Sequence, residues 1–168
     1  MIKHRILLKT IRIDDIDIMK KLFNEKKISE FYDIPKSKND LEKFCSPDGI
    51  KIIKKIIVLK ETKTIIWVIS IGNISRKNKR CDIWYFLWEK YEWIGLMKES
   101  LLLMIQKLFK NNGFNKIQAW IRIDNIGSVK LIEKLWFKRE WTIRNFKKIN
   151  NVYFDFYIYG LLKKDWKV

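Results

Sequence analysis

The sequence predicts one mixed α/β (α+β) domain, with a central sheet of six to seven strands flanked by about four helices. Runs rich in β-branched and aromatic residues alternate with runs of helical periodicity, in the order strand, helices, three strands, helix, strand, helix and two strands. The chain of 168 residues is 48% hydrophobic, which suffices for one buried core. Since no repeat and no linker divides it, we expect a single domain over residues 1–168.

The first elements are predicted to be a strand and two helices. Residues 6–13 form the strand, and Asp14 and Asp15 can cap the helix that follows. The buried face of this helix consists of apolar residues at helical spacing, namely Ile16, Met19, Leu22 and Phe23. A second short helix is expected from Asn39 or Asp40, with a turn at residues 46–49.

Three largely antiparallel strands are expected next. Residues 50–60 and 64–74 are β-rich, and the three residues between them have the length of a hairpin connection. A polar turn over residues 76–80 leads to a third strand, residues 82–87.

The helix with the clearest periodicity covers residues 95–110. Its apolar stripe consists of Met97, Leu101, Ile105, Leu108 and Phe109. Asn111, Asn112 and Gly113 end it, because these residue types tolerate positive φ. The remaining elements are a strand over residues 114–123, a helix over residues 125–135 and two strands over about 137–145 and 152–162.

Composition argues against several classes of protein. No apolar run reaches the roughly 18 to 20 residues of a membrane span, and the charged N-terminal residues lack a small-residue cleavage site, so no signal peptide is expected. Cys45, Cys81 and His4 cannot supply the four ligands of the usual zinc site. We therefore expect a cytoplasmic protein that takes no metal and no membrane partner.

The net charge of +17 allows two interpretations. It is typical of proteins that bind nucleic acid. However, the lysines are scattered through every segment, and isoleucine is equally frequent, which is the joint excess that an AT-rich genome produces. Compositional drift is the favoured interpretation, and the charge would still attract an anionic ligand.

The segment from Lys90 to Gly95 reads K-Y-E-W-I-G and precedes the periodic helix. It resembles the (Q/R)-x-x-G-x-(G/A) signature of the GNAT family of N-acetyltransferases, with lysine first and Trp93 at a glycine position. In that family the free backbone N–H groups of such a loop and helix N-terminus hold the pyrophosphate of coenzyme A. The resemblance therefore implies acetyl-CoA as co-substrate, bound by Lys90, Trp93, Ile94, Gly95, Leu96 and Met97.

A second segment, residues 124–141, resembles the later family motif N-x-x-(S/A)-x-x-L-x-x-K-x-G-F-x-x-x-G. The match begins at Asn125 and Ser128, which the resemblance places against the cofactor, with Asn125 on the pantetheine arm. The aromatic tail, residues 153–166, is similar to the ending of the subgroup that acetylates the N-termini of ribosomal proteins. The resemblance covers essentially the whole chain and implies the GNAT fold.

The resemblance also implies direct transfer of an acetyl group to a primary amine, which must first lose a proton. Asp82 occupies a position where many relatives have a glutamate, so it is the candidate general base; a solvated carboxylate at a strand start is the equal alternative. Backbone N–H groups near Phe86 and Leu87 would hold the oxyanion. Relatives often have a tyrosine where this chain has Ile132, so Ser128 is the candidate acid.

Three further residues have mainly structural interpretations. Tyr85 is expected to pack in the core, and Glu99 to stabilise the first turns of its helix. Asp155 resembles a family aspartate of the last hairpin and is either structural or in contact with the acceptor.

Six tryptophans stand where the family has or readily accepts glycine, namely Trp67, Trp84, Trp88, Trp93, Trp136 and Trp141. Position 136 follows a helix and should adopt left-handed φ, which a bulky side chain resists. The chain has 8 Trp and 6 Gly. If these six tryptophans were glycines, the glycine content would be near its ordinary share of about 7%. We hypothesise that the gene encodes glycine at these positions with UGA codons.

Several functions remain open from the sequence. The leading acceptor is a protein N-terminus, and the alternative is a small-molecule amine such as a polyamine, an amino sugar or an aminoglycoside. A nucleic-acid-binding module is the competing class, and it predicts aromatic and basic side chains on one sheet face. An inactive relative that binds acyl-CoA follows if Trp93 is a true tryptophan. A homodimer is also left open.

Overall fold

The computed structural model describes residues 4–24, 28, 35, 37–46, 51–87 and 94–167. Its seven strands are hydrogen-bonded in the order β1-β2-β3-β4-β5-β7-β6. β4 pairs with β5 in parallel, whereas β1 with β2, β5 with β7 and β6 with β7 are antiparallel pairs. Four α-helices, α1, α3, α4 and α5, accompany the sheet in the described residues. The predicted mixed fold, with six to seven strands and about four helices, is confirmed.

The chain divides into two compact units, which are described separately. Unit 1 comprises Met1–Ser70 and Tyr85–Ser100, and unit 2 comprises Ile71–Trp84 and Leu101–Val168. Two strands and one helix contribute residues to both units: β3 (Ile65–Ser75), β4 (Arg80–Leu87) and α4 (Leu96–Lys110). Among the described residues, no helix combines the length and the apolar character that crossing a membrane requires.

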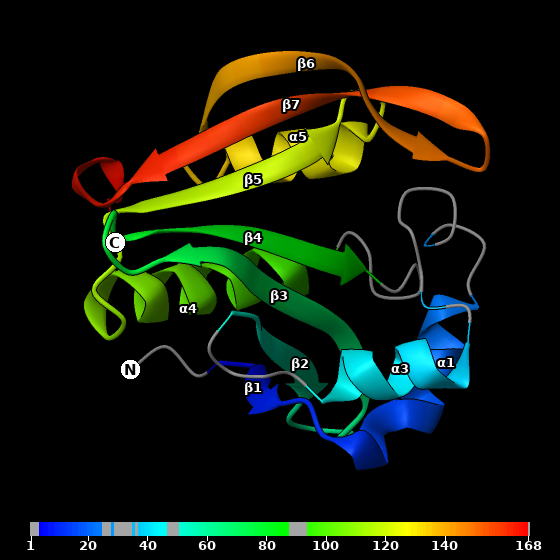
Figure 1. Cartoon of the computed structure of the whole chain (residues 1–168). Coiled ribbons are helices and arrows are strands. Elements are labelled where there is room, and N and C mark those ends of the chain that lie inside the picture. Colours follow the sequence, from blue (N-terminus) through cyan, green and yellow to red (C-terminus); the bar gives the residue numbers. More distant parts are fainter. Residues whose placement is uncertain are drawn as a thin grey trace. The chain divides into compact units, whose positions relative to one another are not determined.

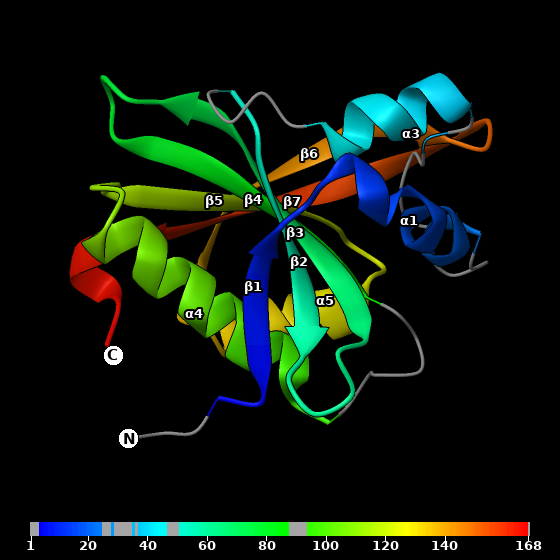
Figure 2. The same ribbon diagram turned by 90° about the horizontal axis from the view of Figure 1, so that it is seen from below.

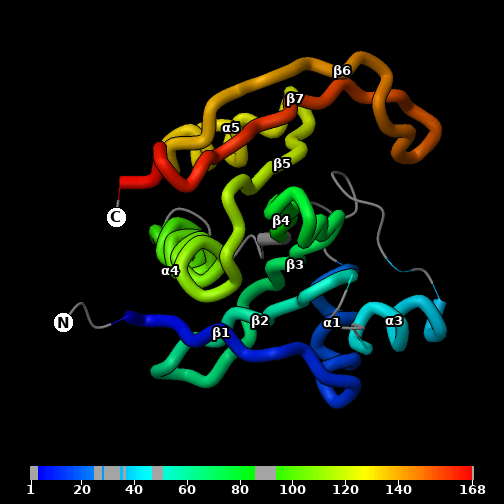
Figure 3. Tube along the Cα trace, turned by 60° about the vertical axis from the view of Figure 1, so that its left-hand side comes forward, coloured from blue at the N-terminus to red at the C-terminus, as the bar shows by residue number. Residues whose placement is uncertain are grey.

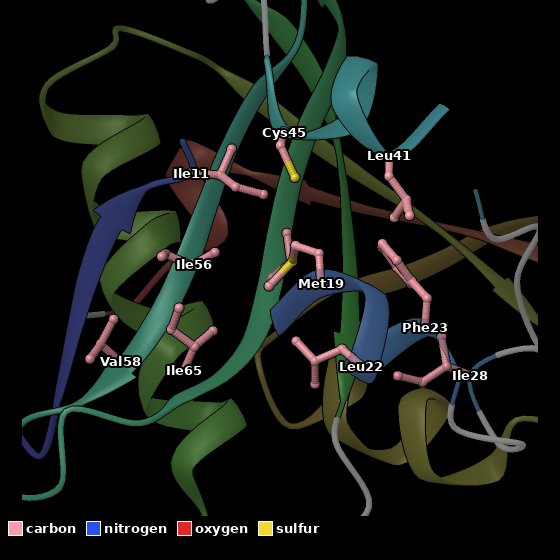
Figure 4. Packing of buried hydrophobic residues seen from close by; sticks show 11 residues of the cluster. Ile11, Met19, Leu22, Phe23, Ile28, Leu41, Cys45, Ile56, Val58 and Ile65 are labelled. Carbon is pink, nitrogen blue, oxygen red and sulfur yellow. The ribbon is translucent and has the colours of Figure 1, made fainter. Parts of the chain in front are cut away.

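Unit 1 begins with β1 (Ile6–Thr10), which pairs with β2 (Ile53–Leu59). The helices α1 (Ile16–Phe23) and α3 (Lys38–Cys45) lie side by side in Figures 1 and 2. Met19 and Phe23 of α1 face a cluster of apolar side chains from α3, β2 and β3, and Figure 4 shows them pointing into one interior. The amphipathic pattern predicted for α1 is thus the pattern that builds the core of unit 1.

The start of α1 differs from the prediction. β1 ends at Thr10 rather than at residue 13, because Ile13–Asp15 form a 3-10 turn. The Asp15 carboxylate accepts a hydrogen bond from the Arg12 backbone N–H at 2.8 Å, which closes this turn instead of capping α1. In α3, Ser37 is the cap: its Oγ accepts from the Asp40 backbone N–H at 3.1 Å, so the helix begins at Lys38.

Unit 2 contains β5 (Lys116–Arg122) and the long hairpin of β6 (Lys138–Ile149) and β7 (Val152–Leu162), which run together in Figures 1 and 3. β6 extends to Ile149, beyond the predicted end near residue 145. The connecting residues Asn150 and Asn151 both have positive φ, 48° and 67°. This is the type I′ geometry that joins two strands with only two residues.

The helix α5 (Ile126–Glu133) lies on one face of the strands of unit 2. The Tyr159 hydroxyl on β7 donates a hydrogen bond to the Glu133 carboxylate of α5 at 2.8 Å. This bond and burial both raise the pKa of Tyr159, to about 12, with burial as the larger cause. The predicted apolar stripe of α4 is buried throughout, from Met97 to Phe109.

The Trp84 indole on β4 packs against Gly72 on β3, where there is no room for a side chain. A Cβ added at Gly72 would lie 2.7 Å from Cζ3 of the Trp84 indole. Gly72→Ala is therefore expected to lower the free energy of unfolding by about 1–3 kcal/mol, as overpacking does. Urea unfolding of Gly72→Ala, Trp84→Gly and the double variant measures the coupling. An equal effect of Gly72→Ala with and without the indole would contradict this packing.

Candidate functional site

Asp82 of β4 is the most deeply buried carboxylate described in unit 2, with 4% of the residue exposed. Its Oδ2 accepts two hydrogen bonds, from Nδ2 of Asn73 at 2.8 Å and from Nε1 of Trp120 at 2.9 Å. Within the described part of the chain, Oδ1 accepts none. A buried carboxylate is thus held through one oxygen, and the other accepts no hydrogen bond from the described residues.

The strand register explains how these groups meet. Asp82 pairs with Gln118 on β5, and Trp120 lies two residues further along β5, so its side chain is on the same face as that of Gln118. Trp120 in turn pairs with Ile158 on β7, whereas the neighbouring Tyr159 points to α5. Asp82 and Trp120 therefore lie on the face of unit 2 that is turned away from α5, which we call the Asp82 face.

Aromatic side chains fix the position of the Trp120 ring. Trp120 stacks on Phe146 of β6 with ring centroids 4.7 Å apart, and Phe146 meets Phe156 of β7 edge-on at 5.3 Å. Trp141 on β6 is 68% exposed, and no described ring contact holds it. The indole of Trp120 is thus oriented by packing, with its N–H directed at Asp82.

The charged residues of the Asp82 face are largely paired with one another. Arg80 donates to Gln118 at 3.2 Å, and Lys116 Nζ lies 2.7 Å from the Glu140 carboxylate. Burial raises the pKa of Asp82, while the hydrogen bonds from Asn73 and Trp120 and the charges of Arg80 and Lys116 oppose that rise. The result is a carboxyl group whose pKa is closer to neutrality than usual, as a general base requires.

The α5 terminus carries the two residues of the second motif. Oδ1 of Asn125 accepts a hydrogen bond from the Ser128 backbone N–H at 3.1 Å, so Asn125 is the N-cap of α5. The Ser128 side chain is partly exposed, and Ile132, at the tyrosine position of the family, is fully buried. Sequence reasoning gave Asn125 a contact with the pantetheine arm, and the structure adds a local role as the helix cap.

At its other end, α5 closes in a Schellman motif. The Trp136 N–H donates to the Glu133 carbonyl at 3.1 Å, and the Phe137 N–H donates to the Ile132 carbonyl at 3.3 Å. Trp136 occupies the C′ position of this motif, directly after the helix, and has φ = 64°. The predicted left-handed conformation at position 136 is therefore confirmed.

In unit 1, Gly95 precedes α4 with φ = 78° and is exposed. The backbone N–H groups of the next residues have no intrahelical acceptor, and the side chains of Leu96 and Met97 are buried, so the backbone is the part that can bind a ligand. Arg5 lies beside this turn: its Nη1 donates to the Ile94 carbonyl at 3.2 Å. A helix start with an adjacent guanidinium suits a phosphate group.

The base of this helix is held by two networks within unit 1. Glu99 accepts hydrogen bonds from the Arg5 backbone N–H at 2.7 Å and from Arg5 Nε at 3.0 Å, so it joins α4 to the residue that precedes β1. Nε1 of the buried Trp67 donates to Ser100 Oγ at 3.2 Å, and that hydroxyl donates to the Leu96 carbonyl at 2.8 Å.

The other predicted residues are placed as follows. Lys90, Trp88 and Trp93 lie outside the described residues, as do residues 47–49 of the predicted turn. Phe86 and Leu87 contribute backbone to the end of β4. Tyr85 is buried, and the Asp155 carboxylate accepts from the Asn145 backbone N–H at 2.8 Å, which gives it a structural role in the hairpin.

Asn73, Trp120 and Arg5 were missed by the sequence reasoning. Asn73 reaches Asp82 from the preceding strand, 9 positions away, and Trp120 from β5, 38 positions away; no motif marks either residue. Among the described residues, no group of three histidine, cysteine, aspartate or glutamate side chains could hold a metal ion.

The mixed sheet and the glycine turn before α4 are the features that the two sequence motifs predict for an N-acyltransferase. The chain belongs to the GNAT family: the Acetyltransferase (GNAT) domain matches residues 5–138. A relative from Bacillus licheniformis, the uncharacterized N-acetyltransferase p20, is 24% identical over 172 residues, covering 96% of this chain and 95% of that protein. The family assignment made from the two motifs is confirmed.

Two solved structures are similar to the whole chain. The ribosomal-protein-S5-alanine acetyltransferase from Vibrio fischeri has a TM-score of 0.85 and 19% identity, and covers 100% of this chain and 98% of its own. The spermidine N-acetyltransferase from Vibrio cholerae, in complex with CoA and spermine, has a TM-score of 0.87 and 16% identity, with coverages of 97% and 98%. At these identities the two structures establish the fold.

Proposed function

We propose that this GNAT N-acetyltransferase acetylates the α-amine of a protein N-terminus, with Asp82 as general base and residues 1–168 acting as one domain. The observation that carries this proposal is the buried carboxylate with both described donors on Oδ2 and none on Oδ1. Acetyl-CoA, when bound, supplies the acetyl group as a thioester. Oδ1 of Asp82 accepts the proton that the amine loses, directly or through one water.

The residues proposed for acetyl-CoA follow the two motifs. The backbone of Ile94, Gly95, Leu96 and Met97 binds pyrophosphate, together with Lys90 and Trp93, which precede them in the sequence. The exposed glycine at positive φ supports this, because a side chain there would crowd the approach of a phosphate oxygen.

Three further residues complete the proposed machinery. Backbone N–H groups of Phe86 or Leu87, at the end of β4, donate to the oxyanion. The Ser128 hydroxyl, in the first turn of α5, acts as the acid by relay: it gives its proton to the departing thiolate and takes up the proton that the amine nitrogen loses as the amide forms. The side chain of Asn125 keeps that turn in place through its cap, so its loss would affect binding of the pantetheine arm.

Two arguments favour an α-amine over a polyamine. An α-amine has a pKa of about 7.7 to 8, against about 10.4 for an alkyl ammonium. A carboxylate base therefore removes the proton from an α-amine at a smaller cost in free energy. A polyamine also needs carboxylates for its further charges, and on the Asp82 face the Glu140 carboxylate is already paired with Lys116. The spermidine enzyme among the structural relatives keeps the polyamine as the second candidate.

The location proposed for this reaction is the cytoplasm. Both cysteines, Cys45 and Cys81, are free and buried, and burial raises the pKa of each thiol, that of Cys81 to about 12. Such thiols are inert and suit a reducing compartment.

Acetyl transfer to a panel of N-terminal peptides and to spermidine tests the acceptor. We expect kcat/KM for the best peptide to exceed that for spermidine by at least about tenfold, with the product acetylated at the α-amine by mass spectrometry. Spermidine as the better substrate would reverse the assignment.

Isothermal titration with acetyl-CoA, on this chain and on Trp93→Gly, tests the co-substrate. We expect the variant to bind acetyl-CoA more tightly, and no binding by either protein would contradict the proposal.

A further inference from the structure

We propose that Asn73 and Trp120 are positioning residues, which hold Asp82 through Oδ2 and leave Oδ1 for the proton of the acceptor amine. This inference rests on the proposed function, because it concerns the same carboxylate. It adds two residues from β3 and β5 that the family motifs of this chain do not contain.

The asymmetry of the contacts carries the proposal. Both donors bind the same oxygen, at 2.8 and 2.9 Å, and two N–H donors fill the two lone-pair directions of one carboxylate oxygen. The two bonds to Oδ2 therefore fix the rotation of the carboxylate about its Cβ–Cγ bond. As a result, the lone pairs of Oδ1 point in one defined direction. A carboxyl group held only for stability would gain more from sharing its donors between both oxygens.

One of the two donors is itself held in place by packing. Trp120 is stacked on Phe146, so its N–H cannot turn away from Asp82 without breaking that contact. Asn73 is exposed and has φ = 46°, a left-handed conformation that asparagine tolerates better than most residues. A fixed donor suits a positioning role, because a misplacement of the base by about 1 Å can cost about 100-fold in rate.

The charges around Asp82 define what a titration should show. Arg80 on β4 and Lys116 on β5 lower the pKa of Asp82, and each of them has a partner of its own. The adjacent Cys81 thiol, with a pKa of about 12, stays neutral over the range of the experiment. The two hydrogen bonds also lower the pKa of Asp82, so removing either donor must raise it further.

Two variants remove the donors with little disturbance. Asn73→Gly deletes Nδ2 and keeps the positive φ, and Trp120→Phe deletes the indole N–H and keeps a ring on Phe146. The matched controls are Asn150→Gly, at a turn residue with φ = 48°, and Trp141→Phe, which deletes an exposed indole N–H on β6 and leaves both donors and the stack on Phe146.

The first readout is a carbon-13 NMR titration of the Asp82 carboxyl in the resting protein, which needs no acceptor. We expect each donor variant to raise the Asp82 pKa by about 1 unit, and the controls to leave it within a few tenths of a unit. Unchanged values in both donor variants would overturn the proposal, whether or not the protein acetylates anything.

The second readout is the pH profile of kcat with the best peptide acceptor. We expect the acidic limb to move upward by the same amount, the plateau of kcat to fall about tenfold, and KM for acetyl-CoA to stay constant. A raised pKa with an unmoved acidic limb and an unchanged plateau would reduce the two residues to a structural role and overturn the proposal. A wild-type protein that titrates as expected and acetylates no amine would instead contradict the proposed function.

Discussion

Replacement of Asp82 by asparagine is expected to lower kcat by about 100- to 10,000-fold and to leave the protein folded. Asparagine has the same shape, and its Oδ1 can accept the hydrogen bonds that Asn73 and Trp120 now donate to Oδ2. It cannot accept a proton from the amine, so only the chemical step is lost. We expect KM for acetyl-CoA to be unchanged, and the acidic limb of the pH–rate profile to disappear with the base.

Asp82→Asn is also expected to change how the stability of the folded protein depends on pH. The pKa of Asp82 is raised in the folded protein above the ordinary value of an aspartate, mainly by burial. The stability that Asp82 contributes is therefore full below the unfolded pKa, declines as the pH rises through the folded pKa, and is constant beyond it. Asp82→Asn removes that decline, so at neutral pH the variant should be at least as stable as the wild type.

Thermal unfolding between pH 4 and pH 8 measures this difference. Asp165→Asn is the matched control, since Asp165 has only a surface ion pair with Lys138 at 3.5 Å, and such pairs contribute little. If Asp82→Asn retains the wild-type kcat and pH profile, Asp82 is not the base. If its Tm falls by many degrees at neutral pH, the carboxylate is needed for folding rather than for catalysis.

Local patterns in the sequence were enough to predict most of the fold. The periodicity of residues 95–110 gives α4, and the apolar spacing after Asp15 gives the face that α1 buries. The boundaries that differ were set by polar side chains. Asp15 bonds the Arg12 N–H and stops β1 early, and the asparagine pair after Ile149 extends β6 by allowing a two-residue turn.

The candidate site was predictable only in part. Asp82, Asn125 and Gly95 could be found because each belongs to a local motif or to a family position. The two groups that hold Asp82 could not, because both contacts depend on how strands pair. Asn73 lies 9 positions away on the neighbouring β3, and Trp120 lies 38 positions away and meets Asp82 through the parallel register of β4 and β5. A motif records which residues are near in sequence, whereas a carboxylate is oriented by whatever the sheet brings beside it.

Of the six tryptophans at glycine positions, the four within the described residues do not share one environment. Trp136 has the left-handed backbone of a glycine at a Schellman C′ position, with φ = 64°. Trp67 has the environment of a true tryptophan: it is 1% exposed, and its indole N–H donates to Ser100. Trp84 packs on Gly72, and Trp141 is largely exposed. Single glycine substitutions should therefore differ in sign and size.

Trp67→Gly is expected to lower the free energy of unfolding by at least about 3–5 kcal/mol, the range for losing a large buried side chain. The indole fills the interior of unit 1, and glycine would leave a cavity as well as a more flexible strand. Trp136→Gly should instead be neutral or stabilising. It relieves a left-handed strain of about 1–2 kcal/mol, and the greater freedom of glycine in the unfolded chain offsets about 0.5–1 kcal/mol of that gain.

Urea unfolding of the two variants, with Trp141→Gly as the exposed control, measures both effects. A strongly destabilised Trp136→Gly would contradict the strain at that position, and a fully stable Trp67→Gly would show that the core does not depend on the indole. The codons then test the hypothesis of UGA-encoded glycine independently. UGG at positions 93 and 136 would contradict it, and UGA at 67 would mean that the natural protein fills the interior of unit 1 without the indole, by closing its strands and α4 around a glycine.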